Sequence, residues 1–78
     1  MIQTNVIKVI DGRGLEPPEP FMLMMDALNG SCPGEVIQLL LMREPFPLYQ
    51  ALDASGFMYQ TRHAADGTVE ILSWRSAE

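Results

Sequence analysis

The sequence predicts an α/β two-layer sandwich, in which two helices cover one face of a four-stranded mixed sheet. Short segments rich in β-branched and aromatic residues alternate with segments whose apolar residues recur at helical spacing, and turns containing glycine or proline separate them. The predicted order is β-α-β-α-β-β, with a right-handed crossover joining the first two strands as a parallel pair. With 78 residues, the chain has room for a single domain covering residues 1–78.

The first strand and the first helix are predicted from the pattern of apolar residues. Residues 5–10 form a short β-prone run, NVIKVI. A helix is expected at about residues 18–28, because apolar side chains recur at helical spacing up to Leu28, and Gly30 is a suitable stop. The methionines of this helix are expected to fill the core, in preference to forming a groove for a partner.

The second strand is expected at residues 35–42, in the middle of the sheet. Ile37, Leu39 and Leu41 share one face and should be buried beneath the helices, because successive side chains of a strand point to opposite faces. The opposite sheet face should carry an apolar patch that is a candidate surface for a homodimer. This patch would include Val36, Leu40 and Met42.

The second half of the chain is predicted to contain a helix and a β-hairpin. Pro47 suits the first turn of a helix that ends at Gly56. Residues 57–63 alternate as a half-buried strand does, and the reversal at Asp66 and Gly67 predicts an antiparallel partner at residues 68–75.

Two loops interrupt this pattern with prolines and charges. Residues 11–20 read DGRGLEPPEP, in which glycines turn the chain and prolines restrict it where the first helix begins. Glu16 and Glu19 suit the positive end of that helix. Residues 43–48 read REPFPL and precede the second helix in the same way.

The first loop resembles the signature of the TusA-like (SirA-like) sulfur-carrier superfamily, in which an RGL turn and a Cys-Pro-x-Pro motif link a strand to a helix. Residues 13–15 match the turn and residues 18–20 match the end of the motif, while Pro17 takes the place of the cysteine. The similarity is greatest to an uncharacterised, cysteine-less branch with RGLEPPEP and a motif resembling REPFPL. This resemblance covers nearly the whole chain and implies the same sandwich fold. In the cysteine-containing relatives, the family's chemistry is the transfer of a persulfide sulfur. Pro17 has no sulfur atom and could not carry out this transfer.

The charged residues of the two loops form the candidate site. Both loops follow parallel strands, and ligands commonly bind at the carboxyl ends of such strands. The alternative is a network of Arg–carboxylate pairs that only stabilises the loops. The candidate residues are Asp11, Arg13, Glu16, Pro17, Glu19, Arg43 and Glu44.

The function expected from these residues is that of a non-enzymatic binding module, whose partner is a protein or a small anion. An alternative is a sulfur-trafficking or redox protein that acts through Cys32 or a thiol-bearing partner. Cys32 precedes the second strand and is therefore expected at the end of the sandwich opposite the loops. A weaker alternative is a small enzyme that uses His63 with the loop carboxylates.

Composition narrows the partners and the location. Ten acidic residues against five basic ones give a formal net charge of −5, which disfavours nucleic acid. No apolar run approaches the ~20 residues needed to span a membrane. The first nine residues lack the pattern of a secretory signal, so a cytoplasmic location is expected. A single cysteine without zinc spacing gives no support for a metal or another cofactor.

Overall fold

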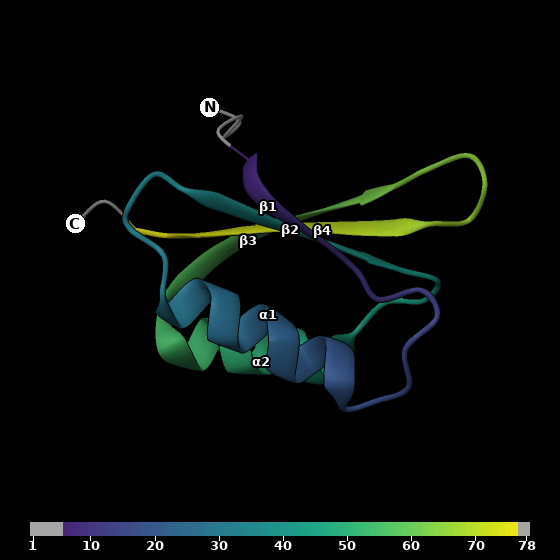
Figure 1. Cartoon of the computed structure of the whole chain (residues 1–78), viewed down its shortest axis with the longest axis horizontal. Coiled ribbons are helices and arrows are strands. Elements are labelled where there is room, and N and C mark those ends of the chain that lie inside the picture. Colours follow the sequence, from purple (N-terminus) through teal and green to yellow (C-terminus); the bar gives the residue numbers. More distant parts are fainter. Residues whose placement is uncertain (1–5, 77–78) are drawn as a thin grey trace.

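The computed structural model describes residues 6–76 and shows two helices packed against one face of a sheet (Figure 1). The predicted fold class and element order are confirmed, and the observed bounds differ from the predicted ones only at terminal residues. Position 5 of the predicted first strand lies outside the described residues. The elements are β1 (Val6–Asp11), α1 (Glu19–Asn29), β2 (Val36–Leu41), α2 (Phe46–Ser55), β3 (Phe57–His63) and β4 (Val69–Arg75).

The four strands lie in the order β1-β2-β4-β3, so β2 and β4 occupy the centre of the sheet. β1 and β2 are parallel, whereas β4 is antiparallel to both of its neighbours, β2 and β3. The carboxyl ends of β1 and β2 therefore lie at the same end of the sheet as the turn of the β3–β4 hairpin (Figure 1). This arrangement brings three connections together at one end of the molecule.

The core lies between the sheet and the two helices. As predicted, Ile37 and Leu39 are buried there, with exposures of 1% and 0%. Leu41 packs against the core but is only half-buried, because it lies at the end of β2 beside a cleft described below. The buried apolar residues of this cluster are Ile10, Met24, Leu28, Ile37, Leu39, Leu48, Leu52, Phe57, Val69 and Ile71.

The methionines of α1 divide between the core and the surface. Met24 is fully buried and Met25 packs against the core, whereas Met22 is exposed. The core-filling role expected of these residues therefore applies to two of the three. α1 ends at Gly30, and α2 ends at Gly56, whose φ of 79° is the left-handed conformation that a helix-ending glycine supplies.

The outer face of the sheet differs in one respect from the predicted apolar patch. Met42 is exposed and Leu40 is half-buried, but Val36 has no exposed surface. In the strand register, Val36 lies between Val6 of β1 and Trp74 of β4, and a residue in the middle of such a row is covered by its neighbours. The patch at this face therefore does not include Val36.

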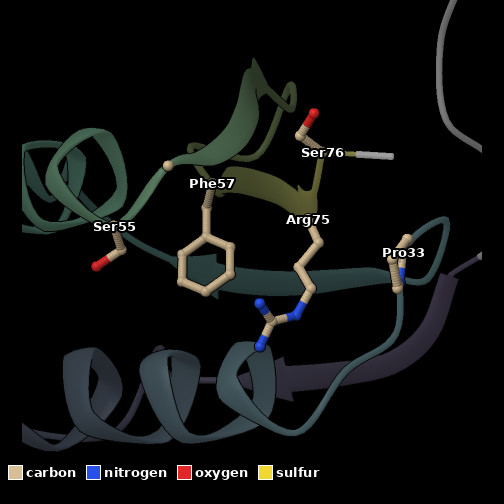
Figure 2. A pocket seen from close by; sticks show the side chains of 6 residues that line it. Pro33, Ser55, Phe57, Arg75 and Ser76 are labelled. Carbon is tan, nitrogen blue, oxygen red and sulfur yellow. The ribbon is translucent and has the colours of Figure 1, made fainter. Parts of the chain in front are cut away.

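Arg75 joins the end of β4 to the last turn of α1 (Figure 2). Its Nε donates to the carbonyl of Ser31 at 2.9 Å and its Nη2 donates to the carbonyl of Asn29 at 3.0 Å. The guanidinium carbon also lies 5.4 Å from the ring centroid of Phe57. Because the last turn of α1 has no basic residue of its own, Arg75 supplies the positive charge that favours a helix C-terminus.

Candidate functional site

A cleft lies between the two proline-containing loops, at the end of the sheet where β1 and β2 finish. Its volume is about 740 Å³, within the range usual for small-molecule sites. Most of the residues around it are apolar, and two arginines and two glutamates complete its wall. The lining residues are Gly12, Arg13, Leu15, Glu16, Pro17, Pro18, Pro20, Phe21, Leu39, Leu41, Met42, Arg43, Glu44, Pro45, Pro47 and Leu48.

Gly12 holds the first loop against β2. Its N–H donates to the carbonyl of Leu40 at 2.9 Å, which extends the parallel ladder by one bond beyond the end of β1. A Cβ atom at this position would lie 2.9 Å from Cδ2 of Leu41 and 3.1 Å from Cβ of Pro20. The close approach of the loop to β2 therefore requires glycine, and it sets the position of one wall of the cleft.

Arg13 is held by Asp11 in a two-pronged ion pair. Its Nε and Nη2 each donate to one carboxylate oxygen at 2.9 Å, and its backbone N–H donates to Oδ1 at 3.2 Å. Hydrogen bonds from Arg13 lower the pKa of Asp11 to about 2, and the carboxylate in turn raises the pKa of Arg13. Nη1 of Arg13 also donates to Oγ1 of Thr68 at 3.4 Å, so the pair connects the first loop to the β3–β4 hairpin.

The Asp11–Arg13 pair should make stability depend on acidity. Because the pKa of Asp11 falls from 3.8 to about 2 on folding, its contribution should be complete above about pH 5 and disappear as the pH falls through 2. We expect Asp11→Asn to be less stable than the native chain at pH 7, with the difference vanishing near pH 2. Urea unfolding across this range measures it. Asp53→Asn is the control, since that exposed side chain makes no hydrogen bond or ion pair with residues 6–76.

The second loop contributes two charged residues, Arg43 and Glu44. Oε1 of Glu44 lies 3.5 Å from Nε2 of His63, so β3 also reaches this end of the molecule. The guanidinium of Arg43 has no hydrogen bond or ion pair within the described part of the chain, although Arg43 lines the cleft. The same cleft is thus lined by Arg13, which is paired with Asp11, and by Arg43, which has no such partner among residues 6–76.

The remaining predicted site residues lie around the first loop. Glu16 and Pro17 line the cleft, and the carbonyl of Glu16 accepts the N–H of Glu19 at 3.0 Å. The Glu19 side chain is exposed in the first turn of α1 and does not line the cleft. Asp11 does not line the cleft, but it pairs with Arg13, which does. The structure therefore brings five of the seven predicted residues to the cleft wall and leaves Asp11 and Glu19 outside it.

Several polar residues near this end were not predicted to belong to the site. The hydroxyls of Tyr49 and Thr61 are hydrogen-bonded at 2.6 Å, and the ring of Tyr49 stacks on that of Tyr59 at 4.9 Å. Burial raises the pKa of the Tyr49 hydroxyl. Asp66 accepts the N–H of Thr68 at 2.9 Å, and its pKa is lowered by that bond. Tyr49 follows the second loop directly along the chain, whereas Thr61, Asp66 and Thr68 come to this end through β3 and the β3–β4 hairpin.

Cys32 lies at the other end of the molecule. It occupies the connection between α1 and β2, where its backbone N–H donates to Oε1 of Glu35 at 2.9 Å, and it is exposed. This connection follows the C-terminal end of α1, at the end of the molecule away from the two loops. Cys32 and His63 therefore share no site.

Within residues 6–76, no three or more His, Cys, Asp or Glu side chains are grouped closely enough to hold a metal ion. Neither of the helices described is long and apolar enough to cross a membrane.

The chain has a SirA-like α/β fold. The structure superimposes on the crystal structure of a SirA-like protein from Desulfitobacterium hafniense with a TM-score of 0.79, covering 90% of this chain and 99% of the other at 20% sequence identity. Residues 9–75 match the family model DUF2249, described as an uncharacterized conserved protein, and the chain belongs to that family. No curated protein matches the sequence significantly.

Proposed function

We propose that this protein is a non-enzymatic binding module whose binding site is the cleft between the two proline-containing loops. The cleft itself carries the proposal, because its volume of about 740 Å³ and largely apolar walls are typical of small-molecule sites. Its position, at the carboxyl ends of two parallel strands, is where open α/β sheets commonly bind ligands. We expect the protein to act in the cytoplasm.

The Asp11–Arg13 ion pair supports the alternative interpretation, in which the charges stabilise the loops, for that part of the network. That interpretation does not account for Arg43, which contacts no carboxylate in residues 6–76 and yet lines the cleft. One side of the cleft therefore carries an arginine that is paired within the loop, and the other carries an arginine that can pair with a ligand. This difference supports binding over stabilisation of the loops alone.

The proposal also places this chain in a branch of the superfamily that has lost sulfur transfer at the usual position. Pro17, in the place of the expected cysteine, lines the cleft and offers no nucleophile. Cys32 does not restore that role in our proposal, since it lies in the opposite connection. In our proposal, binding in the apolar cleft beside Pro17 takes the place of sulfur transfer at this position of the fold.

The proposal is tested by nuclear magnetic resonance, with ¹⁵N-labelled protein titrated with phenyl compounds that carry hydroxyl, carboxylate, ammonium or amino-acid head groups. We expect at least one to shift the amide signals of Leu15, Leu41 and Met42 while leaving those of the Cys32 connection unchanged. Leu15→Trp, which fills the cleft, should abolish these shifts. Met22→Trp, at an exposed site on α1 outside the cleft lining, should retain them. No shift at the cleft with any compound would overturn the proposed function.

A further inference from the structure

We infer that the cleft binds a mainly apolar molecule with a single carboxylate, and that Arg43 is the residue that binds this carboxylate. The inference rests on the proposed function, since it specifies the ligand class of the same site. Three features of the site support the inference. They are the apolar walls, the charged side chains that are already paired within the protein, and the small number of free backbone N–H groups at both helix N-termini.

The walls indicate that most of the ligand is apolar. The lining includes Leu39 and Leu48, which are buried with exposures of 0% and 1%, and prolines from both loops. Proline rings and leucine side chains offer no hydrogen bonds, so a strongly polar ligand would lose its hydration there without replacement. An aromatic or aliphatic group gains from the same surface by leaving water.

The charges on the wall favour an anionic head group at Arg43. Arg13 already binds Asp11 through two hydrogen bonds, and Glu44 lies 3.5 Å from His63, which pairs with it as an ion only when the imidazole is protonated. Arg43 lacks any such partner among residues 6–76, and its planar guanidinium can bind a carboxylate through two parallel hydrogen bonds. Glu16 also lacks an ion pair among residues 6–76 and, like Arg43, is exposed; it precedes the N-terminus of α1, where the helix dipole favours a negative charge.

The helix N-termini argue against phosphate or sulfate as the anion. Sites for those ions usually use several backbone N–H groups at the start of a helix. At α1, Pro20 has no N–H and Glu19 donates its own to Glu16. At α2, Pro47 has none and Leu48 donates to Pro45 at 2.9 Å. Both helices thus begin with a Pro-x-Pro segment that leaves few donors free, so recognition of an anion passes to the arginine side chain.

The test compares four probes that share a phenylpropyl body: 3-phenylpropionate, 3-phenylpropan-1-ol, 3-phenylpropylamine and phenylalanine. We expect 3-phenylpropionate to bind about tenfold more tightly than the alcohol, because a charge-assisted pair replaces a neutral contact. Arg43→Gln should remove this preference while the alcohol still binds. Arg62→Gln is the matched control, because Arg62 on β3 pairs with Glu70 on β4 at 3.0 Å and does not line the cleft. This variant should leave all affinities unchanged.

The outcomes separate the inference from the proposed function. Equal binding of the acid and the alcohol, or a preference that survives Arg43→Gln, would overturn the ligand class while the cleft remained a binding site. Tighter binding of the amine or of phenylalanine than of 3-phenylpropionate would show that an ammonium group is recognised, by Glu16 or Glu44, and would overturn the single-carboxylate ligand class. If no probe shifts the cleft signals, both the inference and the proposed function fail.

Discussion

Replacing Leu39 by alanine is expected to destabilise the protein by about 2–5 kcal/mol, the range observed when a fully buried leucine is truncated. Leu39 has 0% exposure, lies on a central strand and packs in the cluster between sheet and helices. A domain of 78 residues has a total stability of only about 4–12 kcal/mol, so this one change removes a large part of it. Urea unfolding followed by circular dichroism measures the loss.

The control for Leu39 is the next residue of the same strand. Leu40 points to the outer face of the sheet and is half-buried, so Leu40→Ala should cost only about 1 kcal/mol. Because both variants remove the same atoms from adjacent positions, their difference reports burial beneath the helices. Equal losses would contradict the assignment of the core to the face that carries Ile37 and Leu39.

Replacing Gly12 by alanine should both destabilise the domain and deform the cleft. The added Cβ would lie 2.9 Å from Cδ2 of Leu41 and 3.2 Å from the carbonyl oxygen of Leu40. Leu41 can move only partly, and the carbonyl belongs to the backbone of a central strand, so the loop must shift away from β2. We expect a loss of about 1–3 kcal/mol in the free energy of unfolding. The amide signals of Leu15 and Met42 should also shift without any ligand.

Gly14 provides a matched control in the same loop. A Cβ atom there would have nothing within 4 Å, and its φ is not positive. Gly14→Ala should therefore be neutral or slightly stabilising, because it reduces the freedom of the unfolded chain. A loss as large as that of Gly12→Ala would show that the loop needs flexibility in general, and would remove the special role of the contact between Gly12 and β2.

The element order could be predicted because its signals are local in the chain. Asp66 and Gly67 specify a reversal, and Gly67 does adopt a positive φ of 93°. Gly56 ends α2 in the left-handed conformation, as its position after a helical pattern indicates. The alternation around Ile37 and Leu39 correctly predicted which face of β2 lies beneath the helices. In each case, the residues that determine the feature are a few positions apart.

The candidate site was only partly predictable for the same reason. Both loops could be assigned to the carboxyl ends of parallel strands, since that follows from a strand-helix-strand order. The size of the cleft could not, because it depends on how closely Gly12 approaches β2. The pattern of charges could be predicted only in part. Asp11 is two residues from Arg13 and its pairing is local, but Glu44 and His63 are separated along the chain by α2 and most of β3.

The sequence by itself determined the secondary structure, the fold class and the absence of a sulfur-bearing residue at position 17, because periodicity, turn residues and residue identity are properties of the chain. The tertiary structure alone decided the strand order, which places β4 between β2 and β3 and brings the hairpin to the loops. It also decided that Arg75 caps α1, 46 residues away from Asn29. Such contacts depend on packing between distant segments, and no local pattern specifies which segments will meet.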